Sequence, residues 1–162
     1  MKEMVDIVDE NDNVIRKATW DEAFKNKLLR RIVRIFISNS KGEMLLQKRS
    51  KKLKIHPGLW SQSAGGAVSS GEKYEETAQR ELLEEVGIKT KLNFLFKIRQ
   101  SDSICSAFEG FYDGKIKSNW EVEKTEFVKI DKIKEEIKNS SRDFTDGFKE
   151  SFKKYLELKG IK

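Results

Sequence analysis

Short stretches of alternating apolar and polar residues, separated by turn-forming residues, fill the first third of the chain. The stretch "MVDIVDENDNVIRKA" predicts two strands around a turn at residues 11–13. "RRIVRIFISNSKGEMLLQKRS" predicts a second and clearer hairpin, with its turn at residues 39–42. Between the hairpins, Thr19 with Glu22 three residues later has the form of a capping box, which predicts a short helix over "WDEAFKN".

The next part of the chain predicts a loop, a strand and an amphipathic helix. Residues 51–60 form a polar loop, and "HPG" near its end enforces a turn before the strand "WSQSA". Ala78, Leu82 and Val86 recur at a spacing of four, and Gly87 is a typical C-terminal stop, so we predict a helix over about residues 73–86. Its apolar side should pack on the sheet.

The remaining residues predict strands followed by helices. Three strands are expected at "KLNFLFKIR", "SICSAFEGFYDG" and "KTEFVKI", and two helices at "DKIKEEIKN" and "DGFKESFKKYLELK". The apolar stripe of the last helix is read as a core contact. The chain shows no linker and no internal repeat, so residues 1–162 are expected to form a single domain. We predict an α/β fold, an α/β/α sandwich with a mixed sheet.

Net charge and its distribution favour an anionic partner. The chain has 33 basic and 27 acidic residues, a formal net charge of +6. Thirteen Lys or Arg residues against three Asp or Glu lie between Arg16 and Lys54. This basic half could hold phosphates, could attract nucleic acid, or could be an ordinary solvated surface.

The chain lacks the features of secreted and membrane proteins. Cys105 is the single cysteine, so it cannot form an intramolecular disulfide. The N-terminal residues contain no apolar run resembling a signal peptide, and no stretch approaches the roughly 20 apolar residues that span a bilayer. We therefore expect a cytoplasmic protein that does not interact with membranes.

Six glutamates lie within residues 72–85, in contrast to the basic character of the whole chain. Glu81, Glu84 and Glu85 fall within roughly a 100° arc of the predicted helix, away from its apolar stripe. Three carboxylates at this spacing suit Mg²⁺, which binds through a few carboxylates together with waters and substrate phosphates. Taken in isolation, the three glutamates are more typical of a solvated acidic helix face, and only the wider pattern of residues favours a metal site.

The residues beside these glutamates fit a metal site. Arg80 could orient one of the carboxylates or could reach back towards Glu72. Gly65 and Gly66 have no Cβ atom, so their backbone can come close to a ligand or a metal ion.

The spacing of these residues matches a known motif. Gly66, five residues, Glu72, seven residues and then "RELLEEVGI" resembles a complete Nudix box over residues 66–88. The resemblance implies a Nudix fold and cleavage of a nucleoside diphosphate linked to another moiety X. In the family, the glutamates matching Glu81 and Glu85, usually with the one matching Glu84, bind Mg²⁺, with Mn²⁺ as the alternative. The carbonyl matching Gly66 assists, and the arginine matching Arg80 orients a glutamate.

A carboxylate is needed as the general base. A divalent metal ion neutralises the diphosphate and lowers the pKa of bound water, and a carboxylate takes the proton from that water. Glu81 or Glu84 could serve. Because some Nudix enzymes place the base on a loop outside the box, Glu121 and Glu123 are further candidates, unless they are surface charges. The predicted catalytic residues are Arg80, Glu81 and Glu84, and the predicted metal ligands are Gly66, Glu81, Glu84 and Glu85.

The resemblance extends beyond the box. "VDIVDENDNVI", "SKGEMLLQKRS", "PGLW" and "RDFTDGF" resemble the branch that contains isopentenyl-diphosphate isomerases and their hydrolase relatives. Isomerases of this type carry a cysteine and a histidine where this chain has Gly65 and Ala67, and a glutamate where it has Ser103. Their histidine-rich metal site cannot be built, since His56 is the only histidine. We predict a pyrophosphohydrolase; the alternatives are an isopentenyl-diphosphate isomerase and a non-catalytic nucleotide- or RNA-binding module.

The expected partner is a small-molecule diphosphate, with nucleic acid less favoured and a homodimer compatible with the resemblance. Cys105 is expected to be a small buried strand residue. His56 could touch substrate at the mouth of the site or could bond within its own loop. Four aromatic residues could stack on a base or belong to the core: Trp20, Trp60, Phe111 and Trp120.

Overall fold

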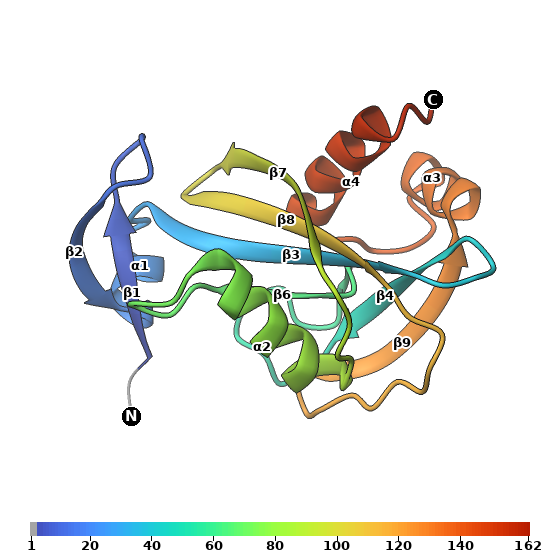
Figure 1. The fold of residues 1–162 in the computed structure, drawn as a ribbon, viewed down its shortest axis with the longest axis horizontal. Coiled ribbons are helices and arrows are strands. Elements are labelled where there is room, and N and C mark those ends of the chain that lie inside the picture. The colour runs from blue at the N-terminus through green and yellow to red at the C-terminus, as the bar shows by residue number, and fades with distance from the viewer. Residues whose placement is uncertain (1–2) are drawn as a thin grey trace.

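The computed structural model describes residues 3–162, in which the chain forms a mixed sheet flanked by helices (Figure 1). The strands are β1 (Met4–Val8), β2 (Val14–Thr19), β3 (Arg30–Ser38), β4 (Glu43–Arg49), β5 (Trp60–Ser61), β6 (Ala64–Ala67), β7 (Asn93–Gln100), β8 (Ser103–Phe111) and β9 (Val122–Lys129). The helices are α1 (Trp20–Lys25), α2 (Tyr74–Val86), α3 (Ile130–Asn139) and α4 (Asp146–Leu158). The predicted α/β class with a mixed sheet is confirmed.

Helices cover both faces of the sheet, because successive side chains of a strand point to opposite faces. Val33 and Ile35 of β3 pack with Leu82 of α2 in one hydrophobic core. Phe36, the next residue of β3, packs with Phe148 of α4 in a second core. In Figure 1, α2 lies below the sheet, and α3 and α4 lie above it. The layers are therefore those of the predicted α/β/α sandwich.

The strands β3 and β4 separate directly after the turn that joins them. Within residues 3–162 they pair only at Ser38 and Met44. Further along, β3 pairs in parallel with β8 and antiparallel with β6, whereas β4 pairs with β9 and β5. The predicted hairpin over these residues is therefore wrong beyond its turn, because both strands find their partners elsewhere in the chain. The sheet opens between them.

Ser63 bridges the two strands where the sheet opens. Its side chain is fully buried. The amide of Ile37 in β3 donates to Ser63 Oγ at 2.8 Å, and Oγ donates to the carbonyl of Leu45 in β4 at 2.6 Å. The predicted strand "WSQSA" is consequently two short strands, β5 and β6, interrupted at residues 62–63.

Helix ends follow the predicted capping signals in part. Thr19 Oγ1 accepts from the amide of Glu22 at 3.1 Å, as the motif requires. The second bond of a capping box would run from the Thr19 amide to the Glu22 carboxylate. Here that carboxylate accepts instead from Arg16 at 3.1 Å. Gly87 ends α2 with φ 69°, which favours glycine because it has no Cβ atom.

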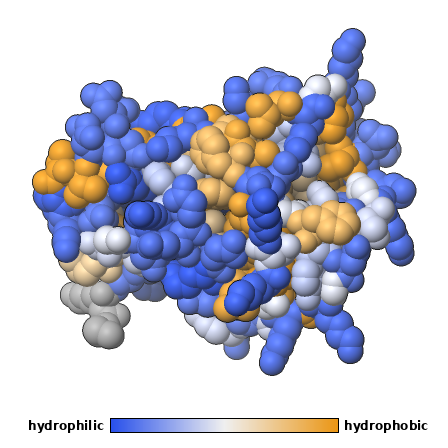
Figure 2. Space-filling model, viewed as in Figure 1, coloured by the Kyte–Doolittle hydropathy of each residue, from blue (hydrophilic) through white to orange (hydrophobic). Residues whose placement is uncertain are grey.

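The face seen in Figure 1 is largely hydrophilic, with separate apolar patches (Figure 2). The patch at its left edge lies over β2, whose Val14 and Ile15 are exposed. Among the helices of the described part of the chain, none combines the length and apolar character needed to cross a membrane.

Candidate functional site

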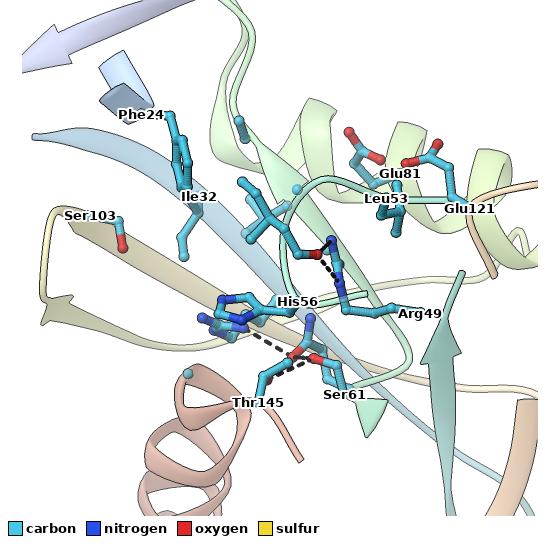
Figure 3. A pocket seen from close by; sticks show the side chains of 18 of the residues that line it. Phe24, Ile32, Arg49, Leu53, His56, Ser61, Glu81, Ser103, Glu121 and Thr145 are labelled. Atoms are coloured by element: carbon cyan, nitrogen blue, oxygen red, sulfur yellow. Dashed lines mark hydrogen bonds between the residues drawn. The ribbon is translucent and has the colours of Figure 1, made fainter. Parts of the chain in front are cut away.

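A cavity of about 760 Å³ lies where β3 and β4 separate. Its walls come from α1, β3, the loop between β4 and β5, β6, α2 and the start of α4. In Figure 3, Glu81 and Glu121 lie at one end of the cavity and Phe24 with Ile32 at another, with Arg49 between them. Segments far apart in the sequence thus meet around one space.

Glu81 and Glu85 of α2 bring two carboxylates to one end of this cavity. They are 9% and 4% exposed, so both are almost removed from water. Gln47 of β4 donates from Nε2 to Glu85 Oε1 at 2.8 Å, and the amide of Gly65 lies 3.4 Å from Oε2. No basic side chain of residues 3–162 comes within 4.0 Å of the Glu85 carboxylate, whose hydrogen-bond donors are neutral.

The environment disfavours the charged form of both groups. Burial raises the pKa of Glu85 well above its ordinary value, and the nearby Glu81 carboxyl raises it further. Burial also raises the pKa of Glu81, although the positive charge of Arg80 opposes that rise. A divalent cation would supply the missing positive charge.

Arg80 contacts three glutamates of the motif, Glu72, Glu81 and Glu84. Its Nε and Nη2 donate to the two oxygens of Glu72 at 2.9 and 3.1 Å, a bidentate pair. Nη1 lies 3.1 Å from Glu81 Oε1 and 3.3 Å from Glu84 Oε2. Arg80 therefore both reaches back to Glu72 and contacts two of the predicted site carboxylates.

Glu84 does not converge with Glu81 and Glu85. Its side chain is 49% exposed and faces Arg80. In the described residues, no three side chains of the types His, Cys, Asp and Glu form a group that could hold a metal ion. Mg²⁺ commonly uses one or two protein carboxylates and completes its shell with water and substrate phosphates, so the pair Glu81 and Glu85 fits this ion.

Gly66 allows β6 to lie against the Glu81 side chain. A Cβ atom added at Gly66 would lie 2.7 Å from Glu81 Oε1, closer than such atoms can approach. The absence of a side chain therefore allows this backbone to lie close to the Glu81 carboxylate. The arrangement is compatible with the predicted use of the Gly66 carbonyl.

The structure separates the two candidate bases outside the motif. Glu121 lines the cavity and lies beside Glu81 in Figure 3. Its amide is bonded to Asn119 Oδ1 at 3.0 Å, and its carbonyl accepts from the amide of Ser50 at 2.9 Å. Glu123 is exposed outside the cavity and lies 3.6 Å from Lys48.

Sequence reasoning missed the polar wall opposite the glutamates. Arg34 and Arg49 line the cavity, and the buried side chain of Gln62 accepts from Arg34 Nη1 at 3.1 Å. The excess of basic residues between Arg16 and Lys54 was the signal, but it did not indicate which residues face inward. His56 also lines the cavity, and partial burial and the charges of Arg49 and Arg34 lower its pKa.

The aromatic candidates occupy different places. Trp20 and Trp120 line the cavity, and the Trp20 ring stacks on Phe24 at 5.1 Å between centroids. Trp60 packs against the second core, and the Arg142 guanidinium lies 4.4 Å from the centroid of its ring. Phe111 is exposed and lies outside the cavity wall.

Ser103 and Cys105 both belong to β8, but of the two only Ser103 lines the cavity. Ser103 lines it, and its hydroxyl donates to the Gln100 carbonyl at 3.1 Å. Cys105 is fully buried in β8, as predicted, and burial raises the pKa of its thiol. A thiol in this environment is a packing group with little thiolate character.

Comparisons with known proteins agree with the motif. The family model described as "NUDIX domain" matches residues 28–148. An uncharacterized Nudix hydrolase of Yersinia pestis is 42% identical over 86 residues, which cover 53% of this chain and 47% of that protein. The chain thus spans about half the length of that relative. An uncharacterized Nudix hydrolase of Pseudomonas aeruginosa is 29% identical over 143 residues, covering 85% of each chain.

Two further relatives cover nearly the whole chain. A prenyl-diphosphate phosphatase of Methanosarcina mazei is 27% identical over 170 residues, covering 94% of this chain and 99% of that protein. The crystal structure of DR0079 from Deinococcus radiodurans superposes with a TM-score of 0.84 and 25% identity, over 93% of this chain and 98% of that one.

Proposed function

The chain belongs to the NUDIX domain family, and on this premise we propose that it is a Mg²⁺-dependent hydrolase of a nucleoside diphosphate linked to a second group X. The observation that carries the proposal is the buried pair Glu81 and Glu85, whose charge lacks full compensation and which lies at one end of a cavity with a basic wall. A divalent cation would compensate the glutamate pair, and a diphosphate would compensate the basic wall.

In the proposed site, Glu81 and Glu85 hold the cation, assisted by the Gly66 carbonyl, and Glu84 joins when it leaves Arg80. Mg²⁺, or Mn²⁺ as the alternative, would neutralise the diphosphate and lower the pKa of the attacking water. Arg80 orients Glu81, because its guanidinium is fixed by the bidentate contact with Glu72.

We assign the general base to a carboxylate that faces the cavity from outside the helix. Glu121 removes a proton from the water as its oxygen attacks phosphorus, while the P–O bond to the leaving group breaks. Glu81 and Glu84 are the alternatives within the motif. Glu121 is favoured because its backbone is fixed at both the amide and the carbonyl and its carboxylate has no basic partner within 4.0 Å in residues 3–162.

An isoprenoid group is the second candidate for the organic part of the substrate. It is supported by the prenyl-diphosphate phosphatase relative and by the apolar side chains of the cavity, among them Phe24, Ile32 and Leu53. An isomerase reaction has no such support, because Gly65, Ala67 and Ser103 occupy the positions of the required groups. We also propose that residues 1–162 act as a single domain in the cytoplasm, with a homodimer as an option.

A substrate panel tests the proposed function. The purified protein is incubated with Mg²⁺ and nucleoside diphosphate derivatives, dinucleotides or isopentenyl diphosphate, and phosphorus and proton NMR follow the products. Phosphate or monophosphate release by the wild type, lost in Glu85→Gln, would support a hydrolase and identify X. Double-bond migration would instead indicate an isomerase. Salt-sensitive RNA binding that persists in Glu85→Gln, without turnover, would indicate a binding module.

A further inference from the structure

Two arginines of the cavity differ from the other arginines of the chain in having no acidic partner. Within residues 3–162, six arginines have a carboxylate oxygen within 4.0 Å: Arg16, Arg30, Arg31, Arg80, Arg99 and Arg142. Arg34 and Arg49 have none, although both line the cavity and are partly buried. A charge withdrawn from water without a counter-charge is unfavourable, so these guanidinium groups favour an anion.

Arg34 is held in place by neutral groups. Its Nη1 donates to Gln62 Oε1 at 3.1 Å, and its Nε donates to Gln100 Oε1 at 3.3 Å. A methyl group at Gly147, in the first turn of α4, would overlap Arg34 Nη2. The guanidinium is therefore fixed on two sides while its positive charge is left uncompensated.

Arg34 lies in a closely packed part of the cavity wall. Gln62 and Gln100, which hold its guanidinium, are each 5% exposed and also line the cavity. Two guanidinium groups without a counter-charge match the double negative charge of a terminal phosphoryl group better than the single charge of an internal one.

Gly65 lies between Arg34 and the glutamates. It is directly opposite Arg34 in the antiparallel pairing of β6 with β3, and its amide is 3.4 Å from Glu85 Oε2. A Cβ atom at Gly65 would lie 2.6 Å from the Val33 carbonyl oxygen, so glycine allows this close packing. Arg34, Glu81 and Glu85 line the same cavity, so one ligand can contact Arg34 and the glutamates together.

Arg49 supplies a second guanidinium to the same wall. Its Nε and Nη2 donate to the carbonyl of Ile55 at 3.1 and 2.9 Å, and Nη1 has no protein partner among the described residues. His56, the next residue of that loop, lies at the cavity wall beside both arginines.

We propose that Arg34 and Arg49 form an anion subsite for a terminal phosphoryl group of the substrate. Guanidinium groups suit phosphate oxygens because their donors are planar and can bind two oxygens at once. This inference rests on the proposed hydrolase function and narrows it: the substrate ends in a free phosphate, so X is a phosphate or carries one at its end.

Inorganic diphosphate, titrated calorimetrically into the full chain in the presence of EDTA, tests the subsite without activity or metal. The wild type is expected to bind it, and Arg34→Gln should weaken binding by about tenfold or more, since it removes charge-assisted hydrogen bonds. The control Arg99→Gln removes the same charge from an exposed pair with Glu10 and should bind like the wild type. No binding by the wild type, or equal binding by both variants, would overturn the subsite.

A second variant separates anion binding from a structural role of Arg34. Gln62→Glu keeps the shape of the side chain but gives Arg34 a carboxylate partner in place. We expect thermal stability to be equal or higher, and diphosphate binding to fall by about as much as in Arg34→Gln. A stable Gln62→Glu protein that binds diphosphate like the wild type would show that Arg34 serves the fold.

Hydrolysis data distinguish failure of this inference from failure of the proposed function. Substrates with a free terminal phosphate should show a raised KM in Arg34→Gln, whereas diphosphates substituted at both ends should be poor substrates of the wild type. Efficient turnover of the doubly substituted compounds would reject the subsite and leave the hydrolase intact.

Discussion

Charged residues at the cavity and at the β1–β2 turn differ in whether the protein provides partners of opposite charge. At the turn, Asp12 accepts from Arg31 Nε at 2.7 Å, from Lys97 at 2.8 Å and from the Tyr74 hydroxyl at 3.1 Å. At the cavity, Glu85 and Arg34 each have neutral partners only. The turn cluster satisfies its charges within the protein, so it stabilises the fold. The cavity leaves opposite charges unsatisfied at two places, so it favours a metal ion and an anionic substrate.

The largest effect that sharpens this contrast is expected from Glu85→Gln. The variant should lose about 10²–10³-fold in kcat, because several kcal/mol of metal-derived charge stabilisation are removed. Without metal its thermal stability should equal or exceed that of the wild type, since the buried Glu85 carboxyl has only neutral hydrogen-bond donors, while the Gln47 contact can persist. Steady-state kinetics and thermal unfolding in EDTA measure the two effects. Strong destabilisation would mean that Glu85 serves the fold.

The second largest effect concerns the loop carboxylates. Glu121→Gln should lower kcat about 10²-fold or more if its carboxylate is the general base. Glu123→Gln is the matched control, since Glu123 is two residues away and faces Lys48 outside the cavity, and its kcat should stay within about twofold. Equal activity of the two variants would indicate that the general base is Glu81 or Glu84.

A smaller effect, on stability and not on activity, is expected from a substitution of Asp12 at the β1–β2 turn. Asp12→Asn should lower the free energy of unfolding by about 1–3 kcal/mol, because Arg31 and Lys97 lose their charged acceptor. Its kcat should be unchanged, since Asp12 lies outside the cavity wall. Denaturant unfolding and steady-state kinetics measure the two quantities. A large loss of kcat at unchanged stability would contradict the division between the two regions.

The smallest effect is the pH dependence of the difference in unfolding free energy between the wild type and Asp12→Asn. Burial would raise the pKa of Asp12, but its hydrogen bonds from Lys97 and Arg31 lower the pKa below the ordinary value. The stabilisation is therefore complete above about pH 4, the unfolded pKa, and is lost as the pH falls through the folded pKa. The difference in unfolding free energy between wild type and Asp12→Asn should shrink as the pH falls below about pH 4. A constant difference would exclude the charge as its cause.

The pattern of the sequence predicted the local elements well, because each has its own signal. The stripe of Ala78, Leu82 and Val86 with Gly87 predicted α2, whose bounds are Tyr74–Val86. The divergence of β3 and β4 could not be predicted, since their partners β8 and β9 are chosen by packing between distant segments. The interruption by Ser63 has no local signal either.

The site was predictable only where a helix arranges it. Residues 81 and 85 lie on one side of α2 because of helical periodicity, and the structure brings both to the cavity. Arg34 and Gln62 meet only because β3 and β6 pair, and neither has a sequence motif. The roles proposed for Gly66, Arg80, Glu81, Glu84 and Glu85 remain predictions for the experiments above.

The separation of β3 and β4 also determines when the cavity can form during synthesis. Ile32 pairs with Cys105 and Leu45 with Phe127, so neither strand has its long-range partner until most of the chain has left the ribosome. Until then, two apolar strands keep unpaired backbone edges, which are the segments most able to join other chains. The feature that creates room for substrate thus makes the nascent chain depend on late strands, and truncation before residue 122 should leave a protein that aggregates.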